Sequence, residues 1–111
     1  MTAGDIAKKY MEIFYSGKNI EELNPLLAPN LKFEGPFYKF NSAEEYLNSL
    51  KKDPPKAMRY EIIQSFEKGS SVCLIYQFSK PGVSVTMAQL FEMGNDKITK
   101  ILLIFDTSAF S

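Results

Sequence analysis

The side chains available for acid–base chemistry are restricted, because the 111 residues of this chain include no histidine. Histidine is the commonest general base near neutral pH and a frequent metal ligand. Ser-His-Asp and Cys-His catalytic sites and histidine-containing zinc sites are therefore excluded. The lone cysteine, Cys73, also excludes a four-cysteine zinc site and an internal disulfide. Proton transfer would have to use Asp, Glu, Tyr, Lys or Cys73 itself, and we expect no metal and no cofactor.

Asp106 is one candidate base, because it follows an unbroken apolar run over residues 101–105. If it were buried there, its pKa would be raised, as a general base near neutral pH requires. A short acid at the end of a strand more commonly accepts hydrogen bonds from the turn that follows. We therefore favour a structural role for Asp106, with Thr107 or Ser108 as its partner.

Helices are predicted in the first half of the chain, interrupted by one short strand. Residues 5–16 form the first, with Gly17 in the position of a C-cap glycine. Its apolar stripe is made by Ile6, Tyr10, Ile13 and Phe14. A short helix near residues 20–27 is limited by Pro25 and Pro29. A third helix begins at Ser42, an N-cap residue, and ends at Asp53-Pro54-Pro55.

Strands make up most of the second half. Residues 31–34 form an early strand, and Phe37-Tyr38 continue it as an edge or hairpin arm after Gly35-Pro36. Four later strands joined by short turns form an antiparallel meander. The last spans residues 97–106, and its apolar run is typical of a strand covered on both faces. Because the helices of so short a chain cover one face only, we expect a second subunit on the other.

The order of these elements resembles the SnoaL-like, nuclear transport factor 2-like superfamily over nearly the whole chain. Three segments carry the resemblance: Leu26–Pro36, Ser42–Tyr46, and Phe91–Ile98 with Phe105-Asp106. It implies one α+β domain over residues 1–111, in which a curved, mostly antiparallel sheet wraps around the N-terminal helices. This cystatin-like cone, or half-barrel, has a mostly apolar pocket at its open end. Members are commonly homodimers through the outer face of the sheet.

Tyr10 is the sharpest catalytic candidate, because Lys9-Tyr10-Met11-Glu12 resembles the Arg-Tyr segment of ketosteroid isomerases within this superfamily. There the tyrosine donates a hydrogen bond to a developing enolate oxygen. The other isomerase residues do not carry over. Gly35 stands where the base Asp is expected, and Glu34, one residue away, points to the opposite face unless a bulge re-aims it. We therefore expect Tyr10 chiefly to pack and to line the pocket.

The pocket is predicted to be lined by aromatic and flexible side chains with few polar groups, which is typical of a small-molecule site. The predicted lining residues are Tyr10, Phe14, Phe33, Tyr46, Leu50, Tyr60, Tyr76, Met87, Gln89, Ile101 and Phe105. The same aromatic spacing is also typical of an ordinary filled core. A functional cavity and a closed core remain alternatives at this point.

Three functions are compatible with the sequence. The leading hypothesis is a protein that binds a small apolar molecule, with cyclic molecules among the candidates. The alternatives are an isomerase, lyase or hydrolase using Tyr10 with Glu34 or Asp106, and a non-catalytic protein-association domain. Thirteen basic and thirteen acidic residues cancel, so no nucleic-acid or membrane partner is expected. The lone cysteine and the absence of a signal-peptide pattern favour a cytoplasmic location.

Overall fold

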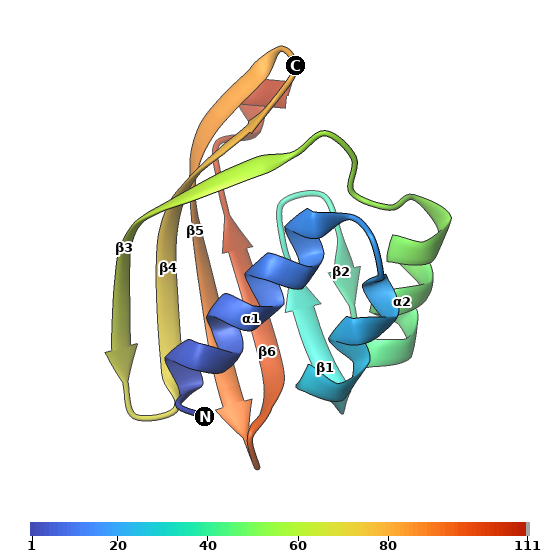
Figure 1. The fold of residues 1–111 in the computed structure, drawn as a ribbon, viewed down its shortest axis with the longest axis vertical. Coiled ribbons are helices and arrows are strands. Elements are labelled where there is room, and N and C mark those ends of the chain that lie inside the picture. The colour runs from blue at the N-terminus through green and yellow to red at the C-terminus, as the bar shows by residue number, and fades with distance from the viewer. Residues whose placement is uncertain (111) are drawn as a thin grey trace.

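The chain forms a six-stranded sheet with helices on its concave face, as seen in a computed structural model that describes residues 1–110 (Figure 1). The helices are α1 (Ala3–Ser16), η1 (Ile20–Leu26), α2 (Ala43–Lys52) and η2 (Thr107–Phe110). The strands are β1 (Leu27–Glu34), β2 (Lys39–Phe40), β3 (Arg59–Lys68), β4 (Ser71–Lys80), β5 (Val83–Gly94) and β6 (Lys97–Ile104). The strand order is β2-β1-β6-β5-β4-β3, and only the β1–β6 pair is parallel. The predicted α+β class with a mostly antiparallel sheet is confirmed.

Capping groups set the ends of the two α-helices; the predicted caps Gly17 and Ser42 are confirmed, whereas α1 begins two residues earlier than predicted. Thr2 caps α1 by accepting a hydrogen bond from the Asp5 amide at 3.1 Å, and Asp5 accepts one from the Thr2 amide in return. Gly17 ends α1 in the left-handed conformation, with φ at 65°. Ser42 caps α2 through a 3.1 Å hydrogen bond from the Glu45 amide. These caps fix where each helix begins and ends, and so which side chains face the sheet.

The core lies between α1 and the concave face of the sheet (Figure 1). Alternate residues of β4 are buried there, and they are Val72, Leu74, Tyr76 and Phe78. Their partners on β5 continue the same face, with Val72 opposite Phe91 and Tyr76 opposite Met87. The alternation of apolar residues in the sequence of β4 and β5 therefore identifies correctly which side chains lie on the concave face.

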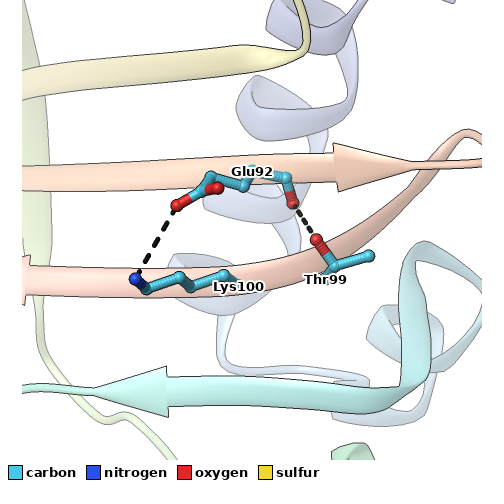
Figure 2. A network of polar contacts seen from close by, with 3 residues as sticks. All are labelled: Glu92, Thr99 and Lys100. Atoms are coloured by element: carbon cyan, nitrogen blue, oxygen red, sulfur yellow. Dashed lines mark hydrogen bonds and ion pairs between the residues drawn. The ribbon is translucent and has the colours of Figure 1, made fainter.

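A β-bulge at Thr99 re-phases β6 against β5. Glu92 pairs with Lys100 and Met93 with Ile98, so Thr99 is the extra residue. Its hydroxyl donates a 3.0 Å hydrogen bond to the Glu92 carbonyl, and the Lys100 ammonium lies 3.8 Å from the Glu92 carboxylate (Figure 2). Because of the bulge, Ile98 and Ile101 are both fully buried although they are three residues apart.

Two expectations for the strands are corrected. Phe37 and Tyr38 are not strand residues but lie in an exposed turn closed by the Gly35 amide, which donates to the Tyr38 carbonyl at 2.9 Å. The last strand also ends at Ile104 rather than at Asp106. Within this chain the run 101–105 is covered on one face only, as expected, because Ile104 is 55% exposed. Cys73 is half-exposed, since it lies on the outer face opposite Phe66.

We predict that Thr99→Val destabilises the chain by about 1 kcal/mol, because the Glu92 carbonyl at the bulge loses its donor while side-chain volume is kept. Chemical denaturation would measure the change in unfolding free energy. Thr86→Val is the matched control, since the Thr86 hydroxyl contacts only an exposed Gln77 side chain at 2.8 Å. Equal stability losses in the two variants would contradict a structural role for the Thr99 hydroxyl.

Candidate functional site

A cavity of about 420 Å³ lies between the concave face of the sheet, the end of α1, α2 and the C-terminal turn η2. It is close to the end of β4, at the top of the molecule in Figure 1. The exposed side chains of Phe37 and Tyr38 belong to its rim. The interior of the cone is therefore not packed solid.

Most of the residues predicted to line a pocket do line this cavity. They are Tyr10, Phe14, Phe33, Tyr46, Leu50, Tyr76, Met87, Gln89 and Phe105. They come together because α1, α2 and strands β1, β4 and β5 present alternate positions to the same concave face. Their role in binding a ligand stays a prediction.

Two predicted lining residues lie elsewhere. Ile101 is fully buried opposite Phe91, in the core rather than in the cavity wall. Tyr60 on β3 packs against the Tyr15 ring at 4.7 Å between centroids, and Tyr15 stands between it and the cavity. The sequence shows that both residues face inward, but it does not show which inward positions lie beneath α1.

The polar part of the cavity is a tyrosine–glutamine cluster made of Tyr10, Tyr15, Tyr46, Tyr76 and Gln89. The Tyr10 and Tyr46 hydroxyls share a hydrogen bond. The Tyr76 hydroxyl donates to Gln89 Oε1 at 2.7 Å, and the Tyr15 hydroxyl donates to that of Tyr76 at 3.4 Å. Gln89 is only 4% exposed. Within residues 1–110, no buried side-chain nitrogen or oxygen lacks a partner, so the cluster is buried at little cost.

Ring packing fixes the orientation of these hydroxyls. The Tyr10 ring meets the Phe91 ring edge-on at 5.2 Å between centroids. The Tyr46 ring stacks on Phe33 at 4.9 Å. Such contacts restrict both rotatable bonds of a tyrosine. The hydroxyls of α1 and α2 therefore meet in a defined geometry, although they are far apart in the sequence.

Burial raises the pKa of each tyrosine in the cluster, because phenolate is poorly solvated there. The pKa of Tyr10 lies well above its ordinary value, with neighbouring Tyr46 adding to the effect and the Gln89 amide opposing it. Burial likewise raises the pKa of Tyr46 and of Tyr76. Burial raises the pKa of Tyr15 to about 12. The cluster is therefore neutral at physiological pH and offers hydrogen bonds without charge.

Neither candidate carboxylate lines the cavity. Glu34 is exposed and pairs in register with Leu102, on the outer face of the sheet. Asp106 is exposed and accepts a 2.9 Å hydrogen bond from the Ser108 amide, which lowers the pKa of its carboxyl. The turn-capping interpretation of Asp106 is confirmed. The bulge that would be needed to re-aim Glu34 inward is absent at this position, because residues 32–34 pair continuously with β6.

Several lining residues were missed, and most belong to segments without a regular period. Phe37 and Tyr38 lie in a turn, Phe110 lies in η2, and Tyr15 lies at the flank of the α1 stripe. Phe78, Lys80 and Leu103 are exceptions, because they share the inward faces of β4 and β6 and the alternation alone could have placed them. The rim of the cavity is thus less predictable than its floor.

Metal binding and membrane insertion find no support in the described chain. Residues 1–110 contain no group of three or more His, Cys, Asp or Glu side chains that could hold a metal ion. Over the same residues, no helix is long and apolar enough to cross a membrane.

We predict that the free energy of unfolding falls between pH 10 and 12 by on the order of 2 kcal/mol on account of Tyr15 alone. Unfolded tyrosine ionises near pH 10, whereas folded Tyr15 stays neutral up to about pH 12. The neutral form thus stabilises the fold below pH 10, and this contribution is lost as the pH rises. Denaturant unfolding across this range would measure it.

The Tyr15→Phe variant should lose stability less steeply over that range, because it has no hydroxyl to ionise there. Tyr38→Phe, in the exposed turn, is the control and should follow the parent chain. Parallel curves for all three proteins would contradict the burial of the Tyr15 hydroxyl.

This chain is similar to known proteins in its structure, as comparison with solved structures shows. No protein-family model matches the chain, and no curated protein matches it in sequence. A nuclear transport factor 2-like protein of unknown function from Cytophaga hutchinsonii superposes with a TM-score of 0.85 at 24% identity, covering 99% of this chain and 95% of that one.

Two further solved structures share the arrangement. A Kribbella flavida protein named as a ketosteroid isomerase has a TM-score of 0.81 at 16% identity, over 94% of this chain and 77% of that one. A Shewanella putrefaciens protein named as a SnoaL-like polyketide cyclase has a TM-score of 0.80 at 17% identity, over 97% and 82%. At these identities the likeness establishes the fold. The chain therefore has the cone fold of the SnoaL-like, nuclear transport factor 2-like superfamily.

Proposed function

We propose that this protein binds a small, mostly apolar molecule in the cavity, with cyclic molecules among the candidates. The observation that carries the proposal is an aromatic cavity of about 420 Å³. The polar groups at its floor are those of the tyrosine–glutamine cluster, and they carry no charge. Apolar walls with a few placed hydrogen-bonding groups are the usual composition of such sites. The shared fold with proteins named as a cyclase and an isomerase supports a small-molecule site.

The tyrosine–glutamine cluster would orient the ligand by a carbonyl or hydroxyl oxygen. Tyr15 is the donor most available for this role, because its 3.4 Å contact with Tyr76 is at the long limit of a hydrogen bond. A ligand oxygen close to Tyr15 would accept a hydrogen bond from its hydroxyl in place of Tyr76. The other cluster members keep shorter hydrogen bonds with each other and hold the floor of the cavity rigid.

The enzymatic alternative is weakened by the placement of its acids. An isomerase, lyase or hydrolase using Tyr10 with Glu34 or Asp106 needs a carboxylate within about 3 Å of the reacting group. Tyr10 meets the requirement for a buried neutral donor. Glu34 and Asp106 both lie in solvent outside the cavity lining, so neither is placed to accept a proton from a ligand in the cavity. Binding without chemistry is the better supported function.

We also propose a homodimer through the outer face of the sheet. An apolar patch crosses β4, β5 and β6 there, formed by Cys73, Ile75, Ala88, Leu90, Leu102 and Ile104. Adjacent members pair in register, including Leu90 with Leu102 and Ala88 with Ile104. Contiguous apolar surface of this kind typically marks an interface. In the association-domain alternative, a different protein binds the same patch.

We also propose a cytoplasmic location, on the basis of the lone cysteine.

The test of ligand binding is calorimetric titration of the purified chain with 2-naphthol, a neutral two-ring probe with one hydroxyl. We expect binding that is weakened at least tenfold by Leu50→Trp, since the larger side chain fills the cavity from α2. Asn48→Trp places the same ring on the exposed side of α2 and should bind like the parent. No heat of binding to the parent chain, or equal affinity in Leu50→Trp, would overturn the proposal.

The dimer is tested by Ile104→Lys, which places a charge in the middle of the apolar patch. We expect the mass measured by analytical ultracentrifugation to halve, because an unpaired buried charge costs several kcal/mol per site. Asn48→Lys adds the same charge on α2, away from the sheet face, and should leave the mass unchanged. An unchanged dimer in Ile104→Lys, or a monomeric parent chain, would show that this face is not the homodimer interface.

A further inference from the structure

The charges around the cavity are unevenly placed. Among the described lining residues, the charged side chains are Asp53 and Lys80. Asp53 is exposed and directly follows the last residue of α2. Lys80 is half-buried at the end of β4, and its ammonium lies 5.3 Å from the centre of the Phe110 ring. Lys80 is thus held at the rim by a cation–π contact.

Lys80 has no anionic partner within the described chain. The ion pairs there join Lys51 to Glu21 and Lys100 to Glu92, and neither involves Lys80. An ammonium that lines a cavity, is oriented by an aromatic ring and lacks a carboxylate leaves a position open for an anion.

Strand β4 sets the separation between this cation and the neutral floor of the cavity. Tyr76, Phe78 and Lys80 are alternate residues that all line the cavity. Residues four apart on an antiparallel strand have Cα atoms roughly 13 Å apart. Tyr76 belongs to the tyrosine–glutamine cluster and Phe78 supplies an apolar surface between the two polar ends. A single strand therefore presents a hydroxyl, an aromatic ring and an ammonium in sequence along the cavity wall.

We infer that the ligand is an amphipathic carboxylic acid, with a carboxylate at Lys80, an apolar body against Phe78 and a neutral oxygen at the tyrosine–glutamine cluster. This inference rests on the proposed binding function and narrows its ligand class from small, mostly apolar molecules in general to those that carry one carboxylate at one end. The apolar body is about the size of two fused rings, which the strand spacing accommodates. Asp53, the other charged lining residue, forms no ion pair with Lys80 in the described part of the chain.

The test compares three probes on the full chain by calorimetry at pH 7: 6-hydroxy-2-naphthoate, its methyl ester, and 2-naphthol. We expect the acid to bind about fivefold more tightly than the ester, as a partly exposed ion pair provides. Lys80→Gln should remove this preference and leave the ester affinity unchanged, whereas Lys80→Arg should keep it. Lys68→Gln is the control, because it removes the same charge at the end of β3, where Lys68 pairs with Ser71 at the start of β4 and does not line the cavity.

The outcomes separate the inference from the proposed function. If the ester and 2-naphthol bind as tightly as the acid, or if Lys80→Gln keeps the preference for the acid, the inference is overturned and the binding function stands. If none of the three probes binds, both are overturned. A preference for the acid that is lost in Lys80→Gln, kept in Lys80→Arg and Lys68→Gln, and reduced by added salt supports the inference.

Discussion

The curvature of the sheet is the constraint on which the rest of the structure depends. Two of the long strands carry an extra residue, Ile63 in β3 and Thr99 in β6, and such bulges bend a strand and increase its twist. A flat sheet of this width would meet α1 along one line only. The bent sheet instead contacts α1 over several strands. The cavity lies beside the C-terminal half of α1, where Tyr10, Phe14 and Tyr15 line it. The cavity is therefore a product of backbone geometry, and side chains only refine it.

The hydrogen bonds of the tyrosine–glutamine cluster solve a problem that an aromatic cavity wall creates. Tyrosine supplies large rings for the wall, but each ring brings a hydroxyl that must find a partner. Here the hydroxyls of α1, α2 and β4 satisfy one another and Gln89. The arrangement keeps the floor uncharged and rigid. A carboxylate among these groups would need solvation or a charged partner, and the cluster offers neither.

Sequence patterns predicted the features that depend on local geometry. Gly17 and Ser42 mark real helix ends, and the alternation in β4 and β5 reports the concave face. The predictions that failed were those that depend on the pairing register of neighbouring strands. The bulge at Thr99 cannot be read from residue types, so the burial of Ile98 together with Ile101 was not predictable. The rim is built by the 35–38 turn and η2, whose positions follow from tertiary contacts, such as the 5.8 Å approach of the Phe37 and Phe110 rings, rather than from any repeat.

The absence of histidine excludes several catalytic mechanisms, and it also affects how the cavity responds to pH. Histidine is the side chain whose ordinary titration falls between pH 5 and 8. The tyrosines of the floor are shifted in the opposite direction, away from that range. The tyrosine hydroxyls at the floor of the cavity therefore keep their protons across the acidity of most cellular compartments. For the proposed ligand, the hydrogen bonds that these hydroxyls provide would be the same at pH 5 and at pH 8.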